Sequence, residues 1–411
     1  LMDFSLRTSG SSVFGTSRKY NTTWSVGLGW NLHKEKFIMD HVGWIDLLKL
    51  RASIGNPGNQ SFDSAQSLLT YSFQYGSMNY FGLGAVLAQI GNPDLEWQIT
   101  VDKNIGLDVT LFNKRFSLTA DYYYKVTDPL LIKVSTPLSS GTETYMTNAG
   151  EQVSQGFTAS VSYYVFQNFE KRFSWMVRAN VRTQKTRIDK IGNKLSTLNS
   201  SGKGSNTVRY YDGADPDDIW AVKSAGIDPS NGKELFYAKD GSYTYDFSYD
   251  DEVVCGNTRP DVEGVIGSSL NWKGFSVSLN FRYQMGADVF NEALYSKVEN
   301  ISRSDLNKNQ DKRALYERWQ EEGDIVRFKN IASAETTPMS SRFVQEENVL
   351  TLESVYLGYE FYDGWIKKLG LSSLKFQVSM RDVFRASTIR SERGISYPFA
   401  RSMEAGLSFN F

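Results

Sequence analysis

The sequence predicts an all-β fold, and specifically a transmembrane antiparallel β-barrel of about twelve strands. Three features of the 411 residues indicate this fold. Apolar and polar residues alternate in one segment after another, the connections between these segments are short and long by turns, and aromatic residues make up 14% of the chain. No stretch approaches the roughly 18–20 apolar residues of a membrane-spanning helix, so a membrane crossing would have to be made by strands.

The alternation has the period of a β-strand, whose successive side chains point to opposite faces. Residues 22–32, for example, place Trp24, Val26, Leu28 and Trp30 on one face. The same pattern predicts strands, in chain order, at 3–10, 22–32, 47–55, 104–112, 115–126, 156–165, 173–184, 265–272, 275–284, 349–361, 374–384 and 401–411. Each has roughly 8–12 residues, the length of a tilted transmembrane strand.

The connections distinguish a barrel from a soluble sandwich. Nothing in a sandwich requires that all connections at one end of the strands be short and those at the other end long. Short connections fall near 112–115, 166–172, 271–274 and 361–372. Long ones fall near 55–101, 128–154, 186–261, 286–349 and 385–401, and the segment 32–46 is a longer connection on the short side. Short periplasmic turns opposite long external loops are typical of outer-membrane barrels.

The second face of the predicted strands is polar and charged. It carries Asp121, Arg178, Arg182, Asn280, Arg282, Gln284, Lys375 and Arg381. Such charges would be costly in a dry sandwich core. We therefore expect this face to line an aqueous or plugged lumen and the apolar face to meet lipid.

Composition excludes several function classes. The net charge is −1 and no basic stripe is visible, so no nucleic-acid partner is expected. With Cys255 as the one cysteine, no internal disulfide can form, and His33 and His41 have no further ligands spaced for a metal site. We find no credible Ser/His/Asp arrangement and expect neither catalysis nor a cofactor.

Several motifs resemble the SusC/RagA-like TonB-dependent outer-membrane transporters. They are "SSVFGTSRKYNTTWSVGLGW", which ends at Trp30, "WIDLLKLRASIGNPGNQ" at 44–60, and "GNPDLEWQ" at 91–98 followed by residues 104–131. The segments "TNAGEQVSQGF", "RPDVEGVIGSSLNWKGFSVSLNFRYQMGADVFN" and "RFVQEENVLTLESVYLGYEF" continue the resemblance in the family's order. It covers essentially the whole chain.

The resemblance implies a 22-stranded barrel filled by an N-terminal plug domain, of which residues 1–411 would be the C-terminal part. Leu1 already reads as strand and no signal peptide is visible, so we expect the plug to lie in a missing N-terminal segment of a longer polypeptide. The family further implies active import of nutrients, most often oligosaccharides, with a SusD-like surface lipoprotein as partner. Energy would come from the TonB–ExbB–ExbD complex acting on the plug.

Candidate substrate-binding residues are aromatic residues of the long connections, which could stack on sugar rings: Tyr71, Tyr75, Tyr80, Tyr210, Tyr211 and Trp220. Packing within the loops is the alternative for each. Phe409 and Phe411 end the chain on an alternating pattern, which resembles the C-terminal aromatic signal for barrel assembly. Trp97 is expected at the membrane interface, at the start of a strand.

Two local structures are predicted inside the long connections. Residues 309–324 suggest a helix with Ala314, Leu315 and Trp319 on one stripe. Residues 228–241 suggest a hairpin with turns at Asn231-Gly232 and Asp240-Gly241, a reading we prefer to a calcium site because the ligand spacing fails.

Alternatives to an oligosaccharide importer are an importer of peptides or siderophore-like ligands, a passive porin, and, from another class, a soluble glycan-active β-protein. A porin would lack the plug and the lipoprotein partner. A soluble protein would turn its charges to solvent rather than to a lumen.

Overall fold

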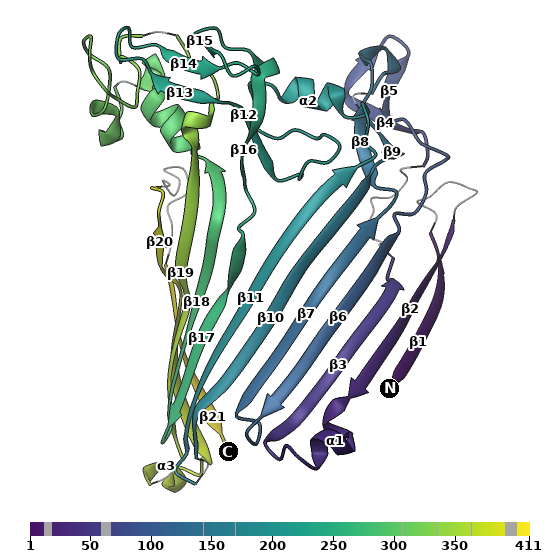
Figure 1. Cartoon of the computed structure of the whole chain (residues 1–411), viewed down its shortest axis with the longest axis vertical. Helices are drawn as coiled ribbons and strands as arrows, with labels where there is room; N and C mark the ends of the chain where they lie inside the picture. The colour runs from purple at the N-terminus through teal and green to yellow at the C-terminus, as the bar shows by residue number, and fades with distance from the viewer. Residues whose placement is uncertain are drawn as a thin grey trace. The chain divides into compact units, whose positions relative to one another are not determined.

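The computed structural model describes residues 1–11, 19–58, 67–142, 144–168, 170–305, 307–333, 335–362, 364–390 and 401–411. Their main feature is a 12-stranded sheet with strand order β1-β2-β3-β6-β7-β10-β11-β17-β18-β19-β20-β21 (Figure 1). Its strands are β1 (Met2–Gly10), β2 (Tyr20–Asn31), β3 (Ile45–Asn56), β6 (Thr100–Leu111), β7 (Phe116–Thr127), β10 (Glu151–Asn168), β11 (Phe173–Asp189), β17 (Val262–Trp272), β18 (Phe275–Phe290), β19 (Val344–Phe361), β20 (Ser373–Ser387) and β21 (Ser402–Asn410). The predicted all-β fold class and the positions of the predicted strands are confirmed.

Several strands are longer than predicted. β10 and β19 have 18 residues each and β11 has 17, whereas the alternating pattern indicated roughly 8–12. Most of the extra residues, such as Arg187 and Asp189 at the end of β11, are polar and lie next to the long connections, with buried exceptions such as Ile188. The pattern alone missed them because the apolar alternation fades beyond the length that spans a bilayer.

The long connections contain their own short strands and helices. The strands are β4 (Thr70–Asn79), β5 (Gly82–Gln89), β8 (Leu131–Ser135), β9 (Thr144–Asn148), β12 (Asp218–Val222), β13 (Ser224–Ile227), β14 (Glu234–Tyr237), β15 (Tyr243–Thr244) and β16 (Glu252–Asn257). The helices are α1 (Lys36–Met39), α2 (Ser196–Gly202) and α3 (Trp365–Lys368), with a π-helical turn at Leu294–Glu299 and 3-10 turns at Leu32–Lys34, Leu138–Ser140, Tyr249–Asp251, Arg303–Asp305, Lys312–Leu315 and Ser341–Phe343. None of the described helices is long and apolar enough to cross a membrane.

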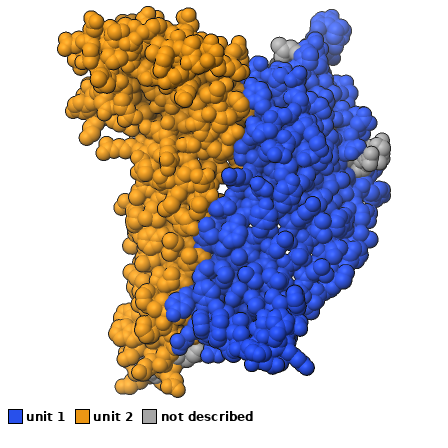
Figure 2. Space-filling model, in the orientation of Figure 1, with its two compact units in different colours: residues 1–163, 180–201, 210–216 blue, residues 164–179, 202–209, 217–411 orange. Residues whose placement is uncertain are grey.

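The chain divides into two compact units, coloured separately in Figure 2. Unit 1 comprises residues 1–163, 180–201 and 210–216, and unit 2 comprises 164–179, 202–209 and 217–411. In unit 1, β3 and β6 are joined through the long connection that carries β4 and β5, whereas β6 and β7 are joined by a tight turn (Figure 1). In unit 2, a two-residue turn joins β17 to β18, and a long connection follows β18.

The apolar face of the sheet is exposed. Strand register aligns Leu28, Ala52, Ile105, Tyr122 and Phe157 in one row across β2, β3, β6, β7 and β10. Ile105 is 64% and Leu28 54% exposed. An apolar face of this extent needs an apolar environment, which for a sheet of such strands is lipid.

The buried hydrophobic clusters lie instead mainly in the long connections. One contains Leu130, Val134, Ile188, Ile191 and Leu195, and a second contains Leu294, Val298, Ala314, Phe328 and Phe343. The third pairs Leu95 with Trp97.

The prediction that Trp97 lies at the membrane interface is wrong. It is only 5% exposed, packs with Leu95 against Leu131 and Met146, and precedes β6, which begins at Thr100. The prediction placed this indole at the membrane interface because aromatic residues favour that site. Packing within the connection prevails because a buried indole removes more apolar surface from water than one at an interface.

The helix predicted at 309–324 is also wrong. Only Lys312–Leu315 form a 3-10 turn, and Leu315 is 68% exposed. Glu317 has a φ of +57°, which ends helical geometry, and the Arg318 side chain is buried on backbone carbonyls, donating from Nε to Ala314 at 2.6 Å. These tertiary contacts outweigh the local helix propensity.

The hairpin predicted near 228–241 is confirmed. β13 and β14 pair antiparallel, as do β14 and β15, and the turn glycines Gly232 and Gly241 have φ values of +69° and +86°. The Gly232 amide donates to the Asp228 carbonyl at 2.8 Å.

Candidate functional site

The polar face of unit 1 carries a network of ion pairs. Arg51 on β3 donates from Nε to Asp108 Oδ2 at 2.8 Å and contacts Asp121 Oδ1 from Nη2 at 3.0 Å. The guanidinium passes over Gly106, whose missing side chain makes room, because a Cβ there would lie 2.7 Å from Arg51 Nη2. Lys125 contacts Asp102 at 2.8 Å. Charges from β3, β6 and β7 therefore neutralise one another on this face.

A cavity of about 510 Å³ opens on this network. Its walls include Arg7, Arg51, Asp102, Asn104 and Asp121. A polar cavity with both signs of charge suits a ligand or a protein segment rich in hydrogen-bonding groups.

The polar face of unit 2 is built in the same way. Arg178 Nη2 donates to Asn280 Oδ1 at 2.8 Å, and Asn280 Nδ2 donates to Ser354 Oγ at 2.9 Å. Arg282 contacts Glu353 at 2.6 Å, next to a register shift in β19. Arg178 on β11 thus reaches over Gly267 of β17 to Asn280 on β18, and the sequence assigned both ends of this link to the polar face.

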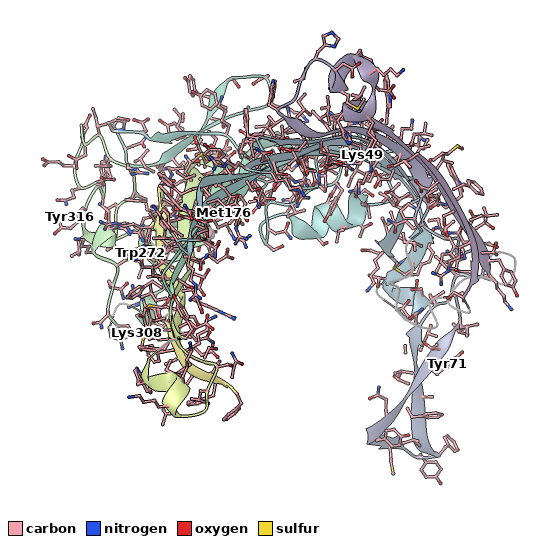
Figure 3. All side chains as sticks on the ribbon, turned by 90° about the horizontal axis from the view of Figure 1, so that it is seen from below. Lys49, Tyr71, Met176, Trp272, Lys308 and Tyr316 are labelled. Carbon is pink, nitrogen blue, oxygen red and sulfur yellow. The ribbon has the colours of Figure 1, made fainter. Side chains whose placement is uncertain are left out.

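The hairpin β4–β5 carries three of the predicted substrate-binding residues. Tyr71, Tyr75 and Tyr80 are 60%, 80% and 97% exposed. Tyr80 packs edge-on against Phe81, with ring centroids 5.3 Å apart. Figure 3 shows the hairpin with Tyr71 extending away from the strands of unit 1. The hairpin thus offers several open ring faces.

The other three predicted residues are less accessible. Tyr210 packs against the cluster of Leu130 and Ile191, and its backbone is fixed by Asn199, which accepts from the Tyr210 amide at 2.9 Å. Tyr211 is 44% exposed. Trp220 lies half-buried on β12, which pairs with β16 in unit 2. Tyr210 thus packs within its loop and Trp220 is half-buried, while the role of all six residues in ligand binding stays a prediction.

Sequence reasoning missed a buried ionic cluster that joins two long connections of unit 2. Arg342 Nη2 donates to Glu234 Oε2 at 2.8 Å and to Glu299 Oε1 at 2.7 Å. Ser340 Oγ donates to Glu234 at 2.5 Å and Thr337 Oγ1 donates to Glu299 at 2.9 Å. One guanidinium therefore ties residues 217–261 to residues 291–343, both in unit 2.

Burial and ion pairing act in opposite directions on the pKa values of the basic groups at this cluster. Burial lowers the pKa of Arg342, but hydrogen bonds and attraction from Glu234 and Glu299 outweigh it, so its pKa is raised. The pKa of Lys329 is lowered, chiefly by burial and against the attraction of Glu299. The side chains of Glu234 and Glu299 are 6% and 0% exposed, and Arg342 forms an ion pair with both. No sequence signal identified these partners, because they lie far apart in the chain.

A second buried pair acts within unit 2. Arg209, fully buried, donates to Glu252 from Nε at 2.9 Å and from Nη2 at 2.7 Å. Nη1 donates to Asn206 Oδ1 at 3.1 Å. Within the described ranges, no group of three or more His, Cys, Asp or Glu side chains could bind a metal ion.

Comparison with known proteins decides the family. The family model described as TonB dependent receptor-like, beta-barrel matches residues 2–301. The chain belongs to this family. Its relatives include the TonB-dependent receptor P39 of Formosa agariphila, 26% identical over 93% of this chain and 41% of the relative, and the TonB-dependent receptor SusC of Bacteroides thetaiotaomicron, 25% identical over 89% and 36%. The chain thus spans about two fifths of the length of these curated relatives.

Solved structures agree on the fold. The RagAB peptide transporter superposes with a TM-score of 0.82 at 23% identity, covering 95% of this chain and 42% of that one. The RagAB peptide importer in its 'closed-closed' state gives a TM-score of 0.83 at 23% identity, covering 100% and 46%. These matches confirm the fold, while the family model and the match to SusC confirm the sequence resemblance to SusC/RagA-like receptors.

Family membership places the chain in the outer membrane, as the sequence predicted. In outer-membrane barrels the short turns face the periplasm and the long loops the exterior. The β4–β5 hairpin and the Arg342 cluster are then external, and the exposed apolar row that contains Leu28 and Ile105 faces lipid. Phe409 lies on β21 opposite Leu374 and is 53% exposed, and Phe411 is 93% exposed, while their role as an assembly signal stays a prediction.

Proposed function

We propose that this chain is the C-terminal barrel portion of a TonB-dependent importer that carries oligosaccharides across the outer membrane. The observation that carries the proposal is the β4–β5 hairpin, which presents Tyr71, Tyr75 and Tyr80 on external loops of a receptor-family barrel. Exposed aromatic rings bind the apolar faces of sugars, and the ion-paired polar strand face offers partners for hydroxyl groups.

Peptides are the second candidate substrate. The solved RagAB structures are described as a peptide transporter and a peptide importer. The cavity lined by Arg7, Arg51, Asp102 and Asp121 favours this candidate, since both signs of charge match peptide termini and side chains.

We further propose a SusD-like surface lipoprotein as partner. The hairpin exposes Phe73, Met78 and Phe81 at 58%, 78% and 92% in addition to its tyrosines. Apolar side chains this exposed in external loops are expected to be covered in the working assembly. Energy for import would come from TonB–ExbB–ExbD through a plug in the N-terminal part of the full-length protein.

The test uses the full-length receptor in its native outer membrane. Uptake of labelled oligosaccharide is measured in cells with the wild-type receptor, with Tyr75→Ala/Tyr80→Ala, and with Tyr316→Ala, an exposed tyrosine of another external loop. Each stacked ring lost is expected to weaken ligand binding by about 1 kcal/mol. The double variant should therefore need a roughly 30-fold higher oligosaccharide concentration for half-maximal uptake, while the control should match the wild type.

Two further measurements separate the alternatives. Uptake that persists after removal of TonB would identify a passive porin and overturn active import. Purification of the native complex should yield a co-purifying lipoprotein with ligand between it and the loops. Peptide at that position would replace the oligosaccharide, whereas a full-length protein that is soluble without detergent would overturn the barrel reading altogether.

A further inference from the structure

The short turns of the chain share a charge pattern that transport does not require. Four successive short turns each contain lysine or arginine: Lys114 and Arg115, Lys171 and Arg172, Lys273, and Lys367 and Lys368. The sequence of these four turns contains two acidic residues, Glu170 and Asp363, against seven basic ones. The excess of cations at this end of the strands is thus a property of the sequence. It holds whatever conformation each of these side chains adopts.

Three of these cations border one pocket of unit 2. The pocket has a volume of about 700 Å³ and is lined by Glu170, Lys171, Arg172, Phe173, Trp272, Lys273 and Tyr362. Two turns form it together, because the Lys273 amide donates to the Arg172 carbonyl at 3.0 Å. Three cations therefore face one carboxylate in a space large enough for a small polar group.

Backbone and ring contacts fix the geometry of the pocket. The Arg172 guanidinium lies 3.9 Å from the centroid of the Tyr362 ring, and the Lys273 ammonium lies 5.8 Å from that of Trp272. Gly274 follows with a φ of +98°, and a Cβ at this position would lie 2.5 Å from the Glu360 carbonyl oxygen. The turn that presents Lys273 therefore depends on a glycine.

An aromatic belt continues from the pocket at the same end of the strands, since Trp272, which lines the pocket, is paired with Phe275. Phe275 packs on Tyr359 at 4.4 Å between ring centroids, Tyr359 on Phe361 at 4.5 Å, and Phe361 on Trp365 at 5.7 Å. Trp272, Phe275 and Trp365 are each about half exposed, and Figure 3 labels Trp272 among the side chains of these strand ends. Half-exposed aromatic rings of this kind lie at the depth of lipid headgroups.

We propose that the pocket formed by Lys171, Arg172, Trp272 and Lys273 binds the phosphate-bearing headgroup of an anionic phospholipid in the periplasmic leaflet. Lysine and arginine supply the charge, arginine adds a planar set of donors that fits phosphate, and the aromatic belt holds the acyl chains and headgroup at the right depth. A lipid fits better than a soluble anion because the belt continues from the pocket along the lipid-facing strand ends.

The test compares lipid retention by the full-length receptor reconstituted in nanodiscs of equal parts phosphatidylglycerol and phosphatidylethanolamine. Native mass spectrometry counts the lipids that remain bound after mild activation. Arg172→Gln/Lys273→Gln is compared with Lys233→Gln/Lys239→Gln, which removes the same charge from two exposed external positions. Heat-modifiable migration in gels verifies that both variants form barrels.

The wild type and the external variant should retain phosphatidylglycerol in preference to phosphatidylethanolamine. The Arg172→Gln/Lys273→Gln variant should lose that preference, with affinity for phosphatidylglycerol weaker by roughly 30-fold for two basic residues. Equal retention of both lipids by the wild type would overturn the proposal, as would equal loss in both variants. Displacement of the lipid by inorganic phosphate as effectively as by glycerophosphoglycerol would show a general anion site and also overturn the proposal.

If Arg172→Gln/Lys273→Gln forms no barrel, Lys273→Gln alone is used with Lys239→Gln as control. These results do not depend on the transported substrate.

Discussion

Removing the guanidinium of Arg342 should loosen two external loops without opening the barrel. In Arg342→Met, the buried carboxylates of Glu234 and Glu299 lose their shared cation, and the Arg327 carbonyl loses a donor at 2.6 Å. Breaking a buried ion pair by deleting one partner costs about 3–5 kcal/mol, most of it the penalty for the charge left behind. Local opening of residues 323–343 should therefore become roughly 100- to 4000-fold more frequent, at about 1.4 kcal/mol per tenfold.

Amide hydrogen exchange of the full-length receptor measures this opening directly. Peptides that cover residues 323–333 and 335–343 should exchange faster, while peptides from β18 should keep wild-type rates. The matched control is Arg327→Met in the same loop, whose ion pair with Glu317 is 3.6 Å long and more than half exposed. An exposed pair contributes about 0–1 kcal/mol, so the control should accelerate exchange by less than about tenfold.

A second variant separates charge from packing. Arg342→Met combined with Glu234→Gln and Glu299→Gln removes the uncompensated charges, and we expect it to recover most of the protection. If Arg342→Met exchanges no faster than Arg327→Met, the cluster does not stabilise the loops and the reasoning is refuted.

Three further outcomes are expected. Burial raises the pKa of Cys255, whose Sγ donates to the Ala221 carbonyl at 3.4 Å. Alkylation of this thiol, followed by mass spectrometry, should therefore be slow at neutral pH and become fast in denaturant. Fast labelling of the folded protein would contradict the burial. Gly274→Ala, at a φ of +98°, should lower the temperature at which the barrel loses heat-modifiable migration through about 1–3 kcal/mol of strain, and an unchanged temperature would contradict it. A hydrogen bond from Tyr245 lowers the pKa of Asp228. Above the ordinary carboxyl pKa of about 3.9, the ionised carboxylate therefore stabilises the folded turn. This stabilisation is lost as the pH falls through the lowered pKa. Proteolysis of the turn should then increase in acid, and Asp228→Asn should lack that transition.

The strand framework could be predicted from sequence because lipid and lumen impose a strict period of two. Leu28 and Ile105 fall on the lipid-facing side, and Arg178 and Asn280 on the polar side, as the alternation indicated. A one-residue error in register would exchange the two faces, so every barrel strand carries this information in its own sequence. The alternation of short and long connections follows from the same topology.

The interior of the long loops could not be predicted in this way. Residues 309–324 have helix-forming composition, yet the buried Arg318 side chain donates to backbone carbonyls of three separate segments. The Trp319 indole donates to the Pro229 carbonyl at 3.0 Å, 90 residues away in sequence. Such contacts depend on which loop lies beside which, and neither propensity nor periodicity contains that information. The Arg342 cluster was missed for the same reason.

The distribution of burial explains how one chain combines a rigid wall with specialised loops. The side chains that are deeply buried lie mainly in the external connections, where Val298 and Phe343 are fully buried, while the barrel strands bury little against one another and rely on backbone pairing and on lipid. Each loop region with its own hydrophobic cluster and ion pairs can therefore change in sequence without altering the register of the strands below. Among the described side chains of the hairpin β4–β5 no such cluster is found, and Tyr75, Tyr80 and Phe81 are at least 80% exposed. The hairpin keeps its apolar side chains exposed, whereas other external loops bury theirs. It is therefore the part of the external surface best suited to bind a substrate or a partner protein, and the tests of both begin there.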